Sequence, residues 1–273
     1  MRNRVFLIIT AIVIIVILAV FIAVNKFSGP SAMAVNPQEN KSIQALQAEL
    51  QNLQKKGDLL AQKAIYQKLI NDFPGNKDVG PWQKKLEEVN IKIIFSPLLS
   101  VSAKEYEVQP LDTLSKIARQ FNTTVELIKK SNHLSSDMIT PGRKLRVWTG
   151  KFSIFVDKSQ NILLLKSNDE LIRSYNVSTG ANNSTPVGTF KIVNKLVNPV
   201  WYKEGAAVPA GSPENILGSR WLGFDLKGYG IHGTTDPSSI GTQATAGCIR
   251  MLKSDVEELY DLVPQDTEVT VMD

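Results

Sequence analysis

An apolar run near the amino end constrains this chain more than any other feature. The stretch "VFLIITAIVIIVILAVFIAV", residues 5–24, holds no charged residue. At a helical rise of about 1.5 Å per residue, such a run spans the hydrocarbon core of a bilayer. Arg2 and Arg4 precede it and only Lys26 follows it closely, so the positive-inside rule leaves the amino end in the cytoplasm. The sequence therefore predicts a transmembrane anchor over residues 1–27, with the rest of the chain exported.

A cleaved signal peptide is the alternative to a retained anchor. Ala32-Met33-Ala34 offers an A-x-A cleavage site shortly after the apolar run. The run is long for the core of a signal peptide, which favours the anchor. A single cysteine, Cys248, leaves no internal disulfide from which to read the compartment.

Charge is unevenly distributed along the chain, whose formal net charge is +5. Residues 151–273 hold 11 Lys and Arg against 14 Asp and Glu, whereas the first 150 residues hold 20 against 12. The basic excess suits an anionic surface such as a membrane or a cell wall. No dense basic run is interleaved with aromatic residues, so nucleic acid is not an expected partner.

Helical periodicity dominates the next segment. The polar, proline-containing stretch 28–40 reads as a linker, and apolar residues three and four apart then predict helices over 43–53, 61–73 and 81–93. The stretch "GDLLAQKAIYQKLINDFPGN" resembles a single tetratricopeptide-like helix pair. Such repeats need about three copies to bury a continuous core. Residues 28–103 are therefore expected to form a linker and a helical stalk, and a groove for a protein partner is the alternative.

From residue 104 the pattern changes to strand, helix, helix, strand. "EYEVQ" alternates, "DTLSKIARQF" has one apolar helical stripe, and "TPGRKLRVW" supplies a turn and a strand with Leu145 and Val147 on one face. In "TTVE", Thr123 and Glu126 are spaced as a capping box that opens the second helix. The segment is small for an independent core.

This whole segment, "YEVQPLDTLSKIARQFNTTVELIKKSNHLSSDMITPGRKLRV", resembles the LysM module. The resemblance implies an α+β domain over residues 104–150 that binds glycans containing N-acetylglucosamine, such as peptidoglycan or chitin. Leu111 stands where the family commonly has glycine, so the turn before Asp112 is expected to be altered. No chemistry is assigned to the loop residue His133. We expect the module to be independent, so that its loss weakens wall association and leaves turnover of small soluble substrates largely intact.

The last part, residues 151–273, is rich in strand patterns, so the chain is multidomain with a mainly β domain at its end. Strands are expected in "KFSIFVD", "NILLLKS", "LIRSYNVSTG", "GTFKIV" and "EVTVM". Residues 194–230 are rich in Gly and Pro with scattered aromatics, which predicts long loops around a binding cleft; surface loops whose aromatics plug the sandwich are the alternative. "SDVE", at 254–257, reads as a second capping box before a helix that Pro264 ends.

The only cysteine follows one of the only two histidines by sixteen residues, in "IHGTTDPSSIGTQATAGCIRM". In an extended segment Cys248 and Arg250 share one face, with Ile249 and Met251 toward the core. An imidazole or guanidinium nearby lowers a thiol pKa and so favours the nucleophilic thiolate. The pattern predicts a cysteine–histidine nucleophilic site, and an inert packed cysteine is the alternative.

Together with "TPVGTFKI" and "ILGSRWLGFD", this stretch resembles the catalytic domain of the L,D-transpeptidases, over about residues 151–273. The resemblance implies an enzyme acting on peptidoglycan stem peptides, with the catalytic part in the periplasm or cell-wall space of a bacterium and the anchor in its inner or cytoplasmic membrane. It implies Cys248 as the nucleophile, His232 as the base and Gly233 as the carbonyl that orients the imidazole. Backbone N–H groups of Gly247 and Cys248 would stabilise the oxyanion.

The implied reaction passes through a cysteine thioester to a 3→3 cross-link, or to exchange or removal of the terminal D-alanine, and such enzymes are generally susceptible to carbapenems. Arg250 is expected to hold a substrate carboxylate, with a structural ion pair as the alternative. Further substrate-binding candidates are Thr245, Thr234, Trp221 and Tyr229. No metal and no cofactor is expected.

One departure and three alternatives stay open. Ala246 replaces the second histidine of the usual Ser/Thr-His-Gly-Cys motif, which puts hydrogen bonding near the oxyanion in doubt. A catalytically weak or inactive wall-binding protein needs only the LysM module and the stalk. A papain-like peptidase places its cysteine before its histidine, the reverse of the order here. A sortase-like enzyme has the same order of His, Cys and Arg, but its histidine lies much farther upstream and its arginine several residues past the cysteine.

Overall fold

The structure is a computed structural model that describes residues 37–203 and 205–273. The predicted membrane anchor lies outside the described residues. Among the helices that are described, none is both long enough and apolar enough to cross a bilayer. The chain divides into two compact units, one up to Gln83 and one from Lys84 to Asp273.

The first unit contains the predicted helices α2 (Pro37–Lys56) and α3 (Leu59–Asp72). Gly57, at φ +69°, makes the turn between them, and the carboxylate of Asp58 accepts a hydrogen bond from the Ala61 amide to cap α3. Of the apolar residues read from the sequence, Ile43 and Leu50 of α2 and Ile65 and Leu69 of α3 are buried. The third helix, α4 (Val79–Phe95), begins in this unit and continues into the second.

The segment that resembles LysM has the expected order of elements. These are β1 (Ala103–Glu107), α5 (Leu114–Gln120), α6 (Val125–Ser131) and β2 (Lys144–Trp148). The two strands pair antiparallel, with Tyr106 opposite Leu145. Leu145 and Val147 are fully buried in a small core of their own, as the alternation predicts.

Both predicted capping boxes are wrong in detail. The N-cap of α6 is Thr124, not Thr123, because Thr124 is extended and its Oγ1 accepts the Leu127 amide at 2.9 Å. The C-terminal helix α7 (Lys253–Leu262) begins one residue before Ser254, and its N-cap is Leu252, which makes no side-chain hydrogen bond. Spacing alone could not choose between adjacent residues, because the cap is decided by which residue leaves the helical conformation.

The turn before Asp112 holds its leucine in a backbone conformation that favours glycine. Leu111 adopts φ +70°, in the left-handed region that favours glycine, and its side chain is exposed. The Asp112 carboxylate accepts hydrogen bonds from the Tyr106 hydroxyl and the Gln109 amide, both at 2.8 Å. The turn is therefore held by Asp112, and Leu111 carries the backbone cost.

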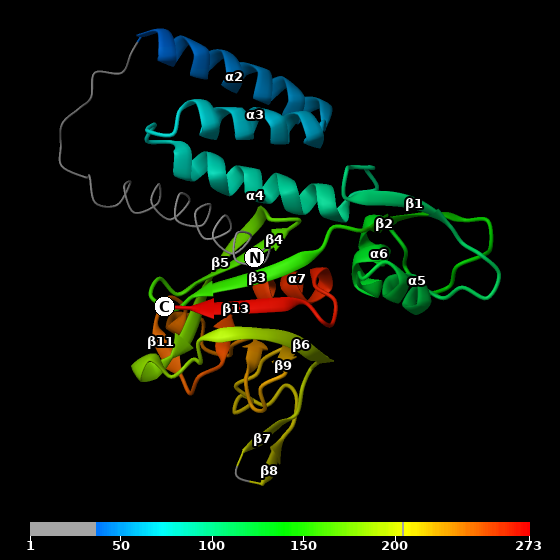
Figure 1. Cartoon of the computed structure of the whole chain (residues 1–273), viewed down its shortest axis with the longest axis vertical. Coiled ribbons are helices and arrows are strands. Elements are labelled where there is room, and N and C mark those ends of the chain that lie inside the picture. Colours follow the sequence, from blue (N-terminus) through cyan, green and yellow to red (C-terminus); the bar gives the residue numbers. More distant parts are fainter. Residues whose placement is uncertain (1–36, 204) are drawn as a thin grey trace, which may run out of the picture. The chain divides into compact units, whose positions relative to one another are not determined.

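The rest of the second unit is a nine-stranded mixed sheet in the order β11-β5-β12-β10-β9-β6-β13-β3-β4 (Figure 1). An additional pairing of β4 with β5 closes it into a barrel-like ring. The strands are β3 (Phe152–Asp157), β4 (Ile162–Ser167), β5 (Glu170–Gly180), β6 (Gly188–Val197), β9 (Arg220–Phe224), β10 (Gly230–His232), β11 (Gln243–Thr245), β12 (Ile249–Met251) and β13 (Glu268–Met272). The expected mainly β architecture is confirmed for this part of the chain.

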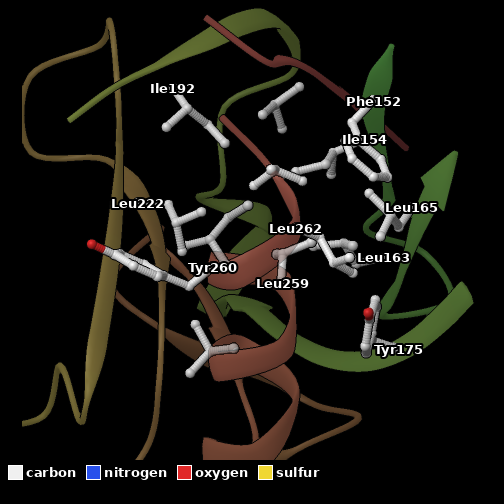
Figure 2. Packing of buried hydrophobic residues seen from close by; sticks show 14 of the residues in the cluster. Phe152, Ile154, Leu163, Leu165, Tyr175, Ile192, Leu222, Leu259, Tyr260 and Leu262 are labelled. Carbon is white, nitrogen blue, oxygen red and sulfur yellow. The ribbon is translucent and has the colours of Figure 1, made fainter. Parts of the chain in front are cut away.

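Helix α7 fills the centre of this ring of strands. Figure 2 shows Leu259 and Leu262 between Leu222 on one side and Leu163 and Leu165 on the other; all five side chains are fully buried. A helix buried in this way stabilises the fold through the apolar surface it removes from water. Ile231 of β10 and Ile249 of β12 belong to the same buried cluster as this helix.

The segment 194–230 is only partly the loop region that its composition predicts. It contains the end of β6, all of β9 and a small hairpin, β7 (Trp201–Lys203) paired with β8 (Ala206–Val208). The hairpin projects beyond β6 and β9 (Figure 1). Glycine and proline frequency marked the turns and missed these strands, because β7 and β8 are only three residues each and β9 pairs with β6 and β10.

The LysM-like segment is bonded to the remainder of the second unit. Thr124 donates its hydroxyl to the backbone carbonyl of Asp261 in α7, and Lys130 pairs with the Asp261 carboxylate at 2.5 Å. Leu127 is fully buried in the same cluster as the barrel strands. The Arg146 guanidinium donates to the carbonyls of Ile93, Ile94 and Leu98, at the end of α4.

Candidate active site

Two short parallel strands bring the histidine and the cysteine segments together. In the register of β10 and β12, His232 lies opposite Arg250 and Ile231 opposite Ile249. Side chains alternate along a strand, so His232 and Arg250 share one face, while Ile231 and Ile249 are fully buried on the other. Cys248 immediately precedes β12, two residues before Arg250.

The two reactive side chains differ in exposure. Cys248 is partly exposed, whereas His232 is only 2% exposed.

The imidazole has a defined tautomer. His232 Nδ1 lies 2.6 Å from the carbonyl oxygen of Gly233. A carbonyl only accepts, so Nδ1 carries the proton and donates, and Nε2 keeps the lone pair. Trp221, opposite His232 on β9, stacks on the ring at a centroid distance of 6.1 Å, and its Nε1 donates to Asn194. The ring is thus oriented from one nitrogen and covered on one side.

Burial keeps both reactive groups neutral in this structure. It lowers the pKa of His232 to about 4, with a further lowering by Arg250, against hydrogen bonds to the backbone of Gly233 and Ile216 that raise it. Burial also raises the pKa of the Cys248 thiol, although hydrogen bonding to the Gly230 backbone and the charge of Arg250 lower it. The expectation of a lowered thiol pKa is therefore wrong for this state, because desolvation outweighs the nearby cation.

The turn before the cysteine requires glycine for two reasons. Gly247 has φ +131°, and a Cβ there would lie 2.7 Å from the Tyr229 ring and 3.3 Å from the Ser184 carbonyl oxygen. Tyr229 therefore lies directly over the turn, as expected of a residue near the site. The Cys248 thiol points back across this turn, with Sγ 3.5 Å from the carbonyl oxygen of Gly228.

Thr245 builds the turn rather than facing substrate. Its hydroxyl donates to the Cys248 carbonyl at 2.6 Å and accepts the Gly247 amide at 3.1 Å, and the residue is 6% exposed. The Gly247 N–H is therefore already bonded, which corrects the expectation of two free backbone donors at the oxyanion position. The Cys248 N–H is left as the backbone donor for that role.

Arg250 lies beside both reactive groups. Its Nη1 donates to the neutral hydroxyl of Ser239 at 2.9 Å, and its Nε is buried without a hydrogen-bond partner among the described residues. The guanidinium thus keeps hydrogen-bonding capacity close to Cys248 and His232. Its charge acts on both, since it lowers the pKa of each.

Thr234 and Ala246, which the sequence also singled out, do not contact the reactive groups in any hydrogen bond of the described residues. The Thr234 hydroxyl is part of a local turn, in which it accepts the Asp236 amide and donates to the Asp236 carbonyl. Ala246 is exposed, so a side chain at this departure from the usual motif would extend toward solvent. Within residues 37–203 and 205–273, no cluster of three or more His, Cys, Asp or Glu is placed to hold a metal ion.

The sequence did not single out three residues that support the site. Asn194 anchors Trp221, Ser239 bonds Arg250, and the backbone of Ile216 reaches His232. They come from the end of β6, the loop before β11 and the loop before β9. No local pattern marks them, because each acquires its role only when the sheet closes.

Comparison with known proteins assigns the class. A model of the L,D-transpeptidase catalytic domain (YkuD) matches residues 151–271, and a LysM domain model matches residues 106–148. YkuD of Bacillus licheniformis, named as an L,D-transpeptidase, is 34% identical over 174 residues, which are 61% of this chain and 97% of that protein. The corresponding protein of Bacillus subtilis is 32% identical with the same coverage. The chain belongs to the L,D-transpeptidase family.

Solved structures of the same class give a weaker likeness. An L,D-transpeptidase from Mycobacterium smegmatis is 20% identical, with a TM-score of 0.39 over 48% of this chain and 64% of that one. The family assignment accordingly comes from the sequence relatives.

Proposed function

We propose that this protein is a peptidoglycan L,D-transpeptidase whose nucleophile is Cys248. One observation carries the residue assignment: the pairing of β10 with β12 sets His232 opposite Arg250, two residues after Cys248, while Nδ1 of His232 donates to the Gly233 carbonyl and leaves the lone pair on Nε2. Membership of the L,D-transpeptidase family supplies the reaction class.

In the proposed acylation step, Cys248 Sγ attacks the carbonyl carbon of the amide between the third stem residue and the terminal D-alanine. Nε2 of His232 takes the thiol proton and then delivers it to the departing D-alanine nitrogen. The C–N bond breaks, an S–C bond forms and a thioester remains on the cysteine. Burial lowers the pKa of His232 and raises that of the Cys248 thiol, so both groups start the proposed step in their neutral forms.

In the second step an amine of a neighbouring stem attacks the thioester and restores the thiol, giving a 3→3 cross-link. Water in place of the amine gives removal of D-alanine. The Cys248 N–H is proposed to hold the oxyanion, a contribution typically of about 3 kcal/mol. Arg250, with an unpartnered Nε, is proposed to hold the substrate carboxylate.

The wider organisation follows the same proposal. The LysM module at residues 104–150 would bind glycan strands beside the catalytic domain at residues 151–273. The helices of residues 28–103 would form the stalk, with a possible protein partner, and residues 1–27 the anchor in the cytoplasmic membrane. The proposed transpeptidation would then take place in the periplasm or the cell-wall space.

The test is acylation of the full-length protein by a carbapenem, followed by intact mass. We expect one adduct on the natural protein, none on Cys248→Ala, and one on Thr234→Ala, whose hydroxyl serves only a local turn. A parallel assay with disaccharide tetrapeptides should give dimers and free D-alanine. An adduct that persists in Cys248→Ala, or unchanged tetrapeptides with the natural protein, would instead favour a wall-binding protein without this chemistry.

A further inference from the structure

A buried amide, Asn215, ties together the base of the β7–β8 hairpin. Its Nδ2 lies 2.8 Å from the carbonyl oxygen of Pro199, 3.3 Å from that of Val208 and 3.2 Å from that of Pro209. Its Oδ1 accepts the Leu217 amide at 3.0 Å, and the residue is 2% exposed. One side chain thus joins the chain entering the hairpin, the chain leaving it and the segment that follows.

The segment after Asn215 lies directly on the backbone that carries the catalytic histidine. A Cβ on Gly218, which has φ +65°, would lie 3.0 Å from the Gly233 carbonyl carbon and from the Thr234 amide nitrogen. A Cβ on Gly233 would lie 3.4 Å from the Leu217 carbonyl oxygen. The two backbones are in contact, so a shift of residues 216–218 moves Gly233.

Both backbone contacts of the imidazole come from this pair of segments. Gly233 supplies the carbonyl that accepts from Nδ1 of His232 at 2.6 Å. Ile216, which directly follows Asn215, supplies the second backbone hydrogen bond that affects the ring. The hydrogen bonds that orient the imidazole therefore depend on where the segment 216–218 sits.

We propose that Asn215 is a positioning residue for the reaction. Its amide fixes residues 216–218 against Gly233, which holds His232 with Nδ1 protonated and Nε2 available to Cys248, so that the β7–β8 hairpin and the imidazole move as one unit. The inference rests on the proposed function, since it takes His232 as the base.

The chemistry of the position explains why an amide stands there. Three carbonyl oxygens face the NH₂ group, and a backbone N–H faces the oxygen. An aspartate would keep the acceptor for Leu217 but set a carboxylate oxygen against three carbonyls. Asparagine satisfies both sides at once, and burial makes any loss costly.

Imidazole NMR tests positioning directly. The chain has two histidines, so ¹⁵N-histidine labelling of the full-length protein gives two rings, and His133→Gln identifies which signals belong to His232. We expect the natural protein to show the Nδ1–H tautomer between pH 6 and 8, and Asn215→Ala and Asn215→Asp to show mixed tautomers. Glu214→Ala, an exposed neighbour in the same loop, should resemble the natural protein.

Carbapenem acylation of the same set gives the functional readout. We expect the rate for Asn215→Ala to fall between about tenfold and a hundredfold, as misplacement of a catalytic group does, with Glu214→Ala unchanged. A variant that loses thermal stability yet keeps the natural tautomer and acylation rate would overturn the inference. Absence of any adduct on the natural protein would overturn the proposed function instead, and the tautomer comparison would still decide the role of Asn215.

Discussion

His232 donates from Nδ1 to the carbonyl oxygen of Gly233, its own neighbour in the chain, across 2.6 Å. Such a bond between adjacent residues needs the Gly233 peptide to turn its oxygen back toward the ring. The contact of Gly233 with Leu217 and Gly218 holds the peptide in that orientation. The state of the imidazole is therefore set by backbone packing, with no carboxylate involved.

The free energy of unfolding should decrease as the pH is lowered, because His232 is buried in its neutral form. Its pKa is about 4 in the folded protein, against roughly 6.5 for an unperturbed histidine. Between those values the unfolded chain binds a proton that the folded chain does not, so the free energy of unfolding decreases as pH falls through this window. The difference amounts to about 3 kcal/mol.

Denaturant unfolding at pH 7, 5.5 and 4 measures this effect. We expect His232→Gln to lose that part of the pH dependence, and His133→Gln, at an exposed loop position, to keep it. Equal slopes for His232→Gln and the natural protein would show that the imidazole is not held neutral.

Gly247→Ala should impair the site more than an equivalent change elsewhere. Gly241 also has a positive φ, +89°, but a Cβ there meets nothing within 4 Å, whereas at Gly247 it would meet the Tyr229 ring at 2.7 Å. Both substitutions pay about 1–2 kcal/mol for the left-handed backbone. Only Gly247→Ala should also displace Cys248, and carbapenem acylation should then slow at least about tenfold. Equal acylation rates for the two variants would contradict this steric account.

Thr245→Val should loosen the turn that holds the nucleophile, since it removes the hydroxyl that bonds both Gly247 and Cys248. We expect a loss of about 1–3 kcal/mol in stability and slower acylation, because two buried backbone groups lose their partner. Thr245→Ser keeps the hydroxyl and should stay close to the natural protein in both measurements. A serine variant as slow as the valine variant would point to packing of the methyl group rather than the hydrogen bonds.

We expect removal of the LysM module to lower the stability and the catalytic turnover of the protein as well as its wall binding. The sequence predicted an independent module, but Leu127 is buried in the barrel core and Thr124 and Lys130 bond to Asp261. Deleting residues 104–148 would expose that surface. We therefore expect a lower thermal unfolding temperature and slower turnover of small substrates.

A point substitution separates this coupling from loss of glycan binding. Arg146→Met leaves three carbonyls at the end of α4 without their donor and should cost about 3 kcal/mol. Arg143→Met, at an exposed position nearby, serves as the matched control. Equal unfolding temperatures for Arg146→Met and Arg143→Met would show that the bonds from Arg146 to the end of α4 do not stabilise the fold.

Local patterns predicted elements well and their ends poorly. Apolar spacing placed α2, α3 and the two helices of the LysM module, because each must bury one stripe. The sequence did not predict the caps at Thr124 and Leu252 or the strands β7 and β8. The backbone conformation at the end of an element depends on its tertiary contacts, which local spacing does not show.

The sequence by itself indicated the family and the candidate reactive side chains. It has one cysteine, and the spacing of its His-Gly, Gly-Cys and Arg residues is typical of this family. Tertiary structure alone decided how these groups behave. Folding buries His232 and desolvates the Cys248 thiol, engages the Gly247 amide with Thr245, and brings Leu217 and Gly218 against Gly233. Desolvation and contacts between distant segments arise only on folding, so no local pattern could encode them.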